Sequence, residues 1–221
     1  MAVMPLFPLG TALMPGAFLP LQIFEPRYVA LLQNLLAGQP EQDPVFGVIA
    51  IRKGREVGEQ AIGTHGLRAL HTVGCTAHIM QAADVGSDRY VVVSQGRTRF
   101  RLDALHDGGT PYHQGEVTLL AEIDGDLDDV RTQGHQLRTE AADYRAYVGV
   151  DEPDIPEDDR ELSYWLPQTV DIDVGERQQL LTSETTASRL RLSRHILRRE
   201  HALTSALGTL GRPDLGPISA N

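Results

Sequence analysis

The stretch that decides the fold is residues 4–28, MPLFPLGTALMPGAFLPLQIFEPRY. Five prolines and two glycines interrupt a run that is otherwise almost wholly apolar. Proline cannot donate to a β-ladder, so it marks strand starts, edges and corners. Gly10 and Gly16 can supply the positive φ that a sharp reversal requires. The stretch therefore predicts short buried strands that turn corners and then enter a helix beginning at Glu25–Pro26.

The residues that follow predict one helix and several more strands. The segment 27–40, RYVALLQNLLAGQP, has leucines at helical spacing, Pro26 suits its first position, and Gly38 is the predicted left-handed stop. Short runs rich in β-branched residues predict strands at 44–51, 76–84, 89–96, 98–106 and 115–122. Strands of this length and spacing are typical of a barrel or a strongly bent antiparallel sheet.

The strand at 98–106 has a two-residue period. Phe100, Leu102 and Ala104 alternate with Arg99, Arg101 and Asp103. This alternation predicts that Phe100 faces the core and that the arginines face water.

After residue 122 the pattern becomes helical. Residues 126–150 carry one apolar stripe, and an acidic linker follows at 151–159. Capping-box spacing predicts helix starts at Asp158 and Asp173, each with a glutamate three residues later. The last helix is predicted from residue 185 to 207, with Leu192, Ile196, Leu203 and Leu207 on its core face. We expect an α+β protein with a β-rich part at 1–122, a helical bundle at 123–210 and a flexible tail at 211–221.

Composition narrows the possible functions. The chain has 221 residues and a formal net charge of −10, so it offers no general electrostatic footprint for nucleic acid or for an anionic membrane. A single cysteine, Cys75, excludes an internal disulfide and fits a reducing cytosol. The apolar start is broken by prolines and has no basic residue before Arg27, which argues against a signal peptide or a membrane span. We expect a cytoplasmic protein.

The opening stretch closely resembles the start of the Lon protease N-terminal domain. The resemblance continues through VFGVIAI, VGCTAHI, DRYVVVSQGRTRFRL and PYHQGEV, and into the helical segment from LSYWLPQ onward, so that it covers residues 3–207. It implies a PUA-like β pseudo-barrel followed by a helical bundle. It also implies a protein- or peptide-binding function, because in Lon proteases this domain helps to recognise substrates and to assemble the hexamer. We expect a stand-alone bacterial member whose partners are polypeptide clients, a protease or a chaperone.

Catalytic motifs of Lon proteases do not occur in this sequence. No G-x-x-x-x-G-K-[ST] loop is present, and Lys53 is the only lysine against nineteen arginines. Lon proteolysis uses a Ser–Lys dyad, and Lys53 lies in a predicted turn among charged residues. We therefore expect no ATPase, peptidase or other enzyme activity, and no cofactor. No histidine pair has helical ligand spacing, so no metal site is expected.

Three other interpretations of the sequence stay open. Cys75 lies near His71 and His78, which would suit a small hydrolase or a small-molecule site in the barrel. GRTRFR, residues 96–101, places Phe100 between arginines, as in modules that stack and neutralise single-stranded nucleic acid. The segment LRLSRHILRRE, residues 190–200, has a basic helix face. It could bind a membrane surface if its apolar side were not packed in the bundle.

The predicted substrate-binding residues come from the resembling blocks. Glu25, Arg27 and Tyr28 would form the rim of a peptide groove, and Phe100 and Tyr112 complete the set. An architectural interpretation of the first three also stays open, in which Glu25 caps the helix and pairs locally while Tyr28 packs beneath it.

Overall fold

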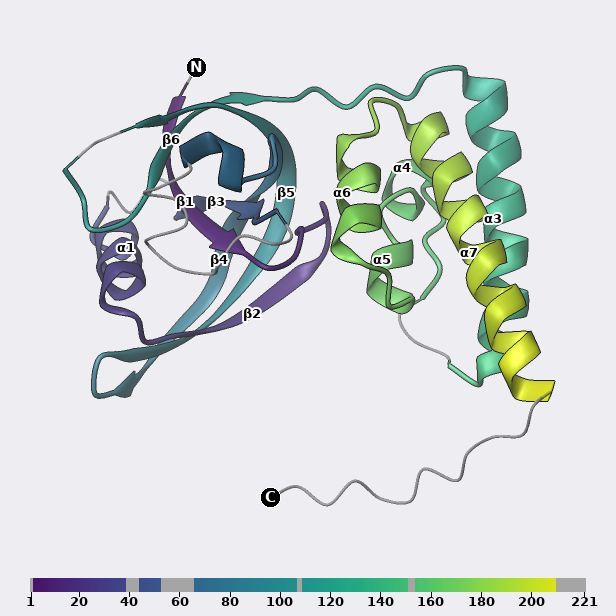
Figure 1. Cartoon of the computed structure of the whole chain (residues 1–221), viewed down its shortest axis with the longest axis horizontal. Helices are drawn as coiled ribbons and strands as arrows, with labels where there is room; N and C mark the ends of the chain where they lie inside the picture. The colour runs from purple at the N-terminus through teal and green to yellow at the C-terminus, as the bar shows by residue number, and fades with distance from the viewer. Residues whose placement is uncertain (1, 39–43, 53–65, 107–108, 151–153, 210–221) are drawn as a thin grey trace.

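A β-barrel and a layer of helices form the two parts of the molecule (Figure 1). The computed structural model describes residues 2–38, 44–52, 66–106, 109–150 and 154–209. The strands are β1 Ala2–Leu9, β2 Phe18–Ile23, β3 Val45–Ala50, β4 Val73–Gly86, β5 Arg89–His106 and β6 Gln114–Leu119. The helices are α1 Pro26–Leu36, η1 Gly66–Ala69, α3 Leu127–Val148, α4 Asp159–Leu162, α5 Leu166–Thr169, α6 Val174–Thr182 and α7 Thr186–Thr209. The predicted α+β class, a β pseudo-barrel followed by helices, is confirmed. Lys53 and the predicted tail lie outside the described residues.

The sheet closes on itself. Its strand order is β2-β5-β4-β3-β1-β6, and β5 also pairs with β6, which completes a ring of five strands. Every pairing is antiparallel except β1 with β3. The strand β2 pairs with the first part of β5, from Phe18 opposite Gln95 to Ile23 opposite Tyr90. It therefore extends the barrel wall as an edge strand with one pairing partner.

The opening stretch forms β1, a turn and β2, as its prolines and glycines predict. Gly16 has φ 83°, whereas Gly10 does not have positive φ. The turn crosses β5 closely, because Gly16 N donates to Gly96 O at 2.8 Å and Gly96 N donates to Ala17 O at 2.9 Å. A Cβ at Gly96 would lie 2.3 Å from Met14 O, so this strand position requires glycine. The glycine is thus part of one long strand, where the sequence had predicted a break between two.

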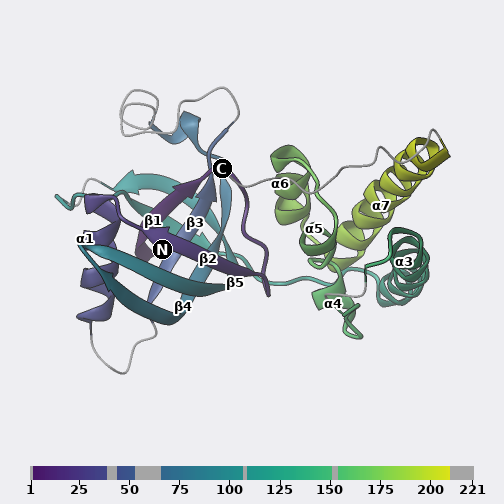
Figure 2. The ribbon, with the colours of Figure 1, turned by 90° about the horizontal axis from the view of Figure 1, so that it is seen from below.

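Helix α1 covers the side of the barrel away from the other helices (Figure 2). It starts at Pro26 as predicted and buries Tyr28, Leu31 and Leu32. Its C-cap is Ala37 in the right-handed helical region, and Gly38 does not have positive φ. The prediction of a left-handed stop at Gly38 was therefore wrong: the amide of Ala37 closes the last turn on Gln33 O without a reversal.

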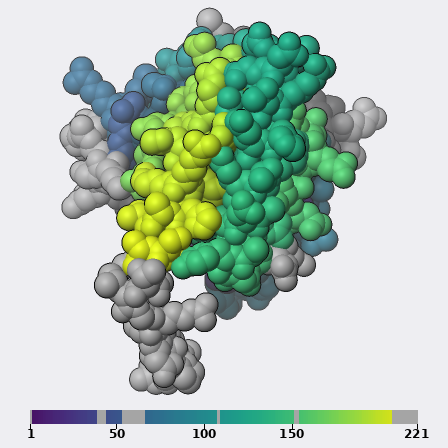
Figure 3. Space-filling view, turned by 90° about the vertical axis from the view of Figure 1, so that its right-hand side faces the viewer, coloured from purple at the N-terminus to yellow at the C-terminus, as the bar shows by residue number. Residues whose placement is uncertain are grey.

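The helical part packs around Leu137, Trp165 and Ile196. Helices α3 and α7 lie side by side across the face seen in Figure 3. Asp158 and Asp173 cap α4 and α6 through their side chains, as predicted. The predicted core face of α7 was partly wrong. Leu203 is 52% exposed, while Leu190 and Leu197 are buried beside Ile196, because α3 covers the stripe that includes these residues.

Candidate functional site

Glu122 joins the barrel to the helices. Its carboxylate accepts hydrogen bonds from Arg99 Nε on β5 at 2.9 Å, Arg189 Nη2 on α7 at 2.8 Å and Tyr164 Oη at 2.9 Å. Arg99 was predicted to face water but is only 2% exposed. The prediction was wrong because the helices cover this face of β5, where Arg99 Nη1 also donates to the carbonyl oxygens of Leu181 and Ser183.

Arg189 is the most deeply buried charge of this junction. It is fully inaccessible, donates to Ser163 Oγ at 2.9 Å, and lies over the Tyr164 ring with its guanidinium carbon 4.3 Å from the ring centroid. Burial lowers the pKa of Arg189 and raises the pKa of Tyr164 from their usual values. A buried charge needs several partners at once. The junction is therefore a fixed connection that holds the two walls of the neighbouring pocket in place.

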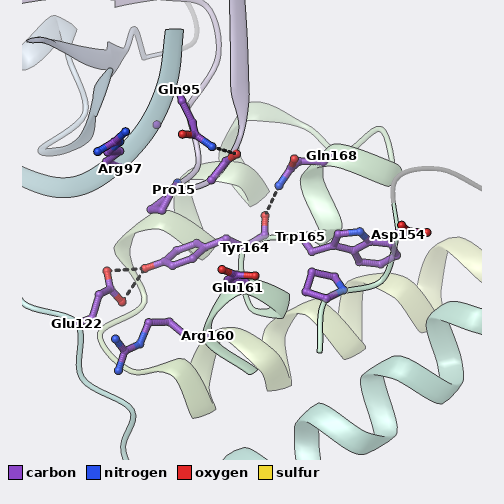
Figure 4. Close-up of a pocket in the computed structure, with 13 residues that line it drawn as sticks. Pro15, Gln95, Arg97, Glu122, Asp154, Arg160, Glu161, Tyr164, Trp165 and Gln168 are labelled. Atoms are coloured by element: carbon purple, nitrogen blue, oxygen red, sulfur yellow. Dashed lines mark hydrogen bonds between the residues drawn. The ribbon is translucent and has the colours of Figure 1, made fainter. Parts of the chain in front are cut away.

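A pocket of about 540 Å³ opens beside this junction, between the barrel and the helices (Figure 4). We call it the seam pocket. Its barrel wall includes Pro15, Gln95 and Arg97, and its helical wall includes Glu161, Trp165 and Gln168. The pocket thus combines aromatic and proline surface with charged groups of both signs.

A groove of about 320 Å³ lies on the other side of the 14–17 turn. Leu13, Phe18 and Leu19 form its barrel side, and Pro167 and Gln168 form its helical side. Gln168 lines both cavities, so the seam pocket and the groove are neighbours along the line where barrel and helices meet.

The groove leads onto an exposed apolar surface. Phe18 and Phe24 are each 64% exposed, at the two ends of β2. Phe24, Val85 and Val91 border a further hollow of about 450 Å³ where β2 meets the β4–β5 hairpin. Pro20 lies between the two phenylalanines on the same outward side of β2. We call Phe18, Pro20, Phe24, Val85 and Val91 the β2 surface.

The structure brings four of the five predicted substrate-binding residues to one region. Arg27 Nη2 lies 2.7 Å from Glu25 Oε2, and both residues line a shallow hollow with Pro26 and Pro111. Tyr28 packs beneath them, stacked on Phe7 with ring centroids 4.0 Å apart. Tyr112 is buried nearby, and its hydroxyl accepts a hydrogen bond from Asn34 at 3.0 Å.

Phe100 lies apart from this region. It is completely buried in a different apolar cluster of the barrel, with Leu6, Ile49 and Val117. No part of its ring is exposed to a ligand in this conformation. Glu25 and Arg27 directly follow Phe24, so the predicted rim adjoins the far end of the β2 surface.

Sequence reasoning missed Phe18, Phe24 and Trp165. In residues 18–24 apolar side chains occur on both alternations, with Leu19, Leu21 and Ile23 on one and Phe18 and Phe24 on the other. That pattern is typical of a strand buried on both faces. In the folded barrel the even-numbered side chains of β2 point outward and are exposed, whereas Leu19, Leu21 and Ile23 pack against the core.

The arrangement around Cys75 does not suit nucleophilic catalysis. The side chain is fully buried, and desolvation raises the pKa of the thiol to about 12. Its sulfur donates to Thr76 O at 3.5 Å. Among the described residues, no group of three His, Cys, Asp or Glu side chains is placed to hold a metal ion.

Most arginines of the two basic segments are paired within the protein. In GRTRFR, Arg99 belongs to the junction, and Arg101 Nε pairs with Asp103 Oδ1 at 2.7 Å. On α7, Arg191 pairs with Asp129, and Arg194 and Arg198 share Glu140. Within the described ranges, no helix is both long enough and apolar enough to cross a membrane.

A closed β-barrel, followed by a helical layer fixed to it through buried arginines, defines the structural class of this chain. Residues 3–199 match the family model described as the ATP-dependent protease La (LON) substrate-binding domain, and the chain belongs to this family.

Similar proteins agree with this assignment. The chain is 25% identical over 211 residues to a Lon protease of Anaeromyxobacter dehalogenans, covering 91% of this chain and 24% of that protein. It is 34% identical over 146 residues to Lon protease 4 of Sorangium cellulosum, covering 66% of this chain and 17% of that protein. Protein cereblon of Gallus gallus is 30% identical over 124 residues, which is 54% of this chain and 24% of cereblon. The chain thus spans about a quarter or less of the length of these relatives.

Solved structures share the fold. A Lon N-terminal domain protein from Xanthomonas campestris has a TM-score of 0.62 at 24% identity, covering 86% of this chain and 96% of that chain. The N-terminal domain of the Mycobacterium avium complex Lon protease has a TM-score of 0.67 at 16% identity, covering 89% and 98%. The barrel and the helices therefore form one recurrent architecture.

Proposed function

We propose that this chain is a non-enzymatic, polypeptide-binding module that holds client chains in extended form along β2. The observation that carries the proposal is the β2 surface, where two phenylalanines that are each 64% exposed flank an edge strand. Exposed apolar patches of this kind are typical of protein interaction sites. Membership in a family described by substrate binding supports the same function.

The geometry of β2 suits an extended peptide. A peptide that adds to a sheet edge gains main-chain hydrogen bonds, and its alternate side chains enter neighbouring hollows. The groove lies at the Phe18 end of β2 and the second hollow at the Phe24 end. Six strand residues span about 20 Å, which is the reach of a client segment of similar length. Glu25 and Arg27 lie at the Phe24 end of this path.

Removal of the two exposed phenylalanines tests the proposal. The double variant Phe18→Ser/Phe24→Ser is titrated against fluorescently labelled β-casein, an unstructured polypeptide, and anisotropy is measured. Burial of one phenylalanine contributes about 1.5–3 kcal/mol, so we expect affinity to fall at least about tenfold.

A matched control separates this surface from apolar exposure in general. Leu127 and Leu203 are 58% and 52% exposed on the helical part. The variant Leu127→Ser/Leu203→Ser should bind β-casein like the unmodified protein. Equal weakening by both pairs, or no effect of the Phe18/Phe24 pair, contradicts a client site on β2.

The proposal places the protein in the cytoplasm, with a separate protease or chaperone as the recipient of its clients. A reducing compartment fits a chain whose one cysteine is buried and unpaired. Crosslinked affinity capture from its own cells, with nuclease treatment in parallel, tests this partner class. Nuclease-insensitive recovery of protease or chaperone subunits is the expected result, and recovery that depends on RNA contradicts it.

A further inference from the structure

The seam pocket carries groups that neither the junction nor the β2 surface uses. Asp154 and Glu161 line its helical wall, and neither carboxylate has an ion-pair or hydrogen-bond partner among the described residues. Arg160, also in the lining, is neutralised by Asp124 through hydrogen bonds of 2.9 and 2.8 Å. Glu122 is engaged by the two buried arginines of the junction. The carboxylates left for a ligand are therefore Asp154 and Glu161.

Two glutamines add further acceptors. Gln95 Nε2 donates to Gly16 O and Gln168 Nε2 donates to Tyr164 O, each at 3.4 Å (Figure 4). One N–H of each amide group is thereby engaged, and the side-chain oxygen has no partner among the described residues. An amide oxygen with free lone pairs accepts hydrogen bonds from a donor-rich ligand. The pocket thus offers two carboxylates and two amide oxygens.

One donor in the pocket is also unsatisfied. Trp165 is only 3% exposed, and its Nε1 has no hydrogen-bond partner within the described part of the chain. A buried donor without an acceptor costs about 1–3 kcal/mol, which a ligand oxygen would offset. A guanidinium or ammonium group has no acceptor atom, whereas a peptide carbonyl does. The pocket therefore suits a basic residue within a polypeptide better than a free cation.

We propose that the seam pocket binds an arginine side chain of the client polypeptide, an inference that rests on the proposed function. The guanidinium would donate to Glu161, Asp154 would add negative charge at the other end of the pocket, and a main-chain carbonyl of the same segment would accept from Trp165 Nε1 (Figure 4). A planar guanidinium can bind the Glu161 carboxylate through two parallel hydrogen bonds. The only unpaired cation in the described lining is Arg97, against two unpaired carboxylates, and the net charge of −10 attracts a basic segment.

The chain supplies its own reporter, because Trp165 is its only tryptophan. The tripeptide acetyl-Gly-Arg-Gly-amide is titrated against the whole chain, and tryptophan fluorescence is recorded, with isothermal titration calorimetry as a second readout. The citrulline peptide is the neutral isostere, and the glutamate peptide carries the opposite charge. We expect saturable binding of the arginine peptide and about tenfold weaker binding of the citrulline peptide, because a hydrogen bond to a charged group is lost.

A matched pair of variants locates the binding. Glu161→Gln should weaken the arginine peptide about tenfold. Asp143→Asn removes the same charge from an exposed position on α3 outside the pocket lining, and should leave the affinity unchanged. Equal affinities for the arginine and citrulline peptides, tighter binding of the glutamate peptide, or no signal in either readout overturns the assignment.

The β-casein titration distinguishes this inference from the proposed function. If β-casein binding depends on Phe18 and Phe24 but the arginine peptide does not bind, the seam pocket assignment fails and the client site on β2 stands. If neither ligand binds, the proposed function fails as well.

Discussion

The barrel and the helical part expose different surfaces. Most of the large apolar side chains on the described surface belong to the barrel, among them Phe18, Phe24 and Val91. The helical part carries a dense set of ion pairs, such as Arg138 with Asp159 and Arg194 with Glu140. Many charges of the helical part are thus paired within it, whereas the barrel exposes apolar surface and the edge of β2.

If the proposed function is correct, the two parts contribute differently to client binding. A surface whose charges are already paired gains little from a new partner. An unpaired edge with apolar neighbours gains main-chain hydrogen bonds and buried area. We infer that the helices serve as a scaffold which completes the seam pocket, and that the barrel supplies the main contact surface.

The largest expected effect is at the junction between the two parts. Arg189→Met removes a fully buried guanidinium and leaves part of the charge of Glu122 uncompensated. Loss of one partner of a buried pair destabilises by about 3 kcal/mol or more. Urea unfolding followed by circular dichroism measures the change. Arg191→Met, which removes a half-exposed partner of Asp129 on the same helix, should cost less than about 1 kcal/mol. Similar costs for both variants would show that burial of Arg189 is not what fixes the junction.

A smaller effect is expected where the barrel backbone approaches itself. Gly96→Ala places a Cβ 2.3 Å from Met14 O, and a backbone oxygen cannot move without the whole turn. Overpacking of this kind destabilises by about 1–3 kcal/mol. Gly10→Ala is the matched control, since its Cβ would meet no atom within 4 Å. Thermal unfolding of both variants measures the difference, and equal midpoints would contradict the close crossing of the turn over β5.

The smallest effect concerns a surface pair of the helical part. Hydrogen bonds from Arg160 and Thr186 lower the pKa of Asp124 below its ordinary value of 3.8. A lowered folded-state pKa contributes stability that is present above the ordinary pKa and is lost as pH falls below it. Asp124→Asn should therefore cost up to about 1 kcal/mol at neutral pH, and the difference should shrink below about pH 3.8. Urea unfolding of this variant and of the unmodified protein between pH 7 and pH 3 checks this. A constant difference across that range would refute the linkage.

Much of the fold follows from local pattern. The prolines of residues 4–28 predict corners and the start of α1, and the caps at Asp158 and Asp173 are correct. Errors arose where a distant element decides the environment. The two-residue period of the strand predicts that Arg99 is exposed to water, yet the helices cover its side chain. Leu203 continues a helical stripe, yet it is 52% exposed.

The candidate site was less accessible to sequence reasoning than the fold. Glu25 and Arg27 were predicted from the motif that starts α1, and in the structure they line a shallow hollow beside that helix. Phe18 and Phe24 carry no local sign of exposure, since an edge strand and a central strand can share one apolar pattern. In the sequence Trp165 cannot be told from any other core aromatic residue. The structure shows that it lines the seam pocket and that its Nε1 has no hydrogen-bond partner among the described residues.

The sequence alone determined the α+β class, the order of most strands and helices, the N-caps at Asp158 and Asp173 and the family, because these depend on neighbours along the chain and on motifs. The tertiary structure alone decided which face of β5 is buried and that β2 is an edge strand. It also decided that Gln95 and Glu161, which are far apart in the sequence, line the same pocket. These properties arise from contacts between residues far apart in the sequence, and no local periodicity encodes which distant surface will cover a given side chain.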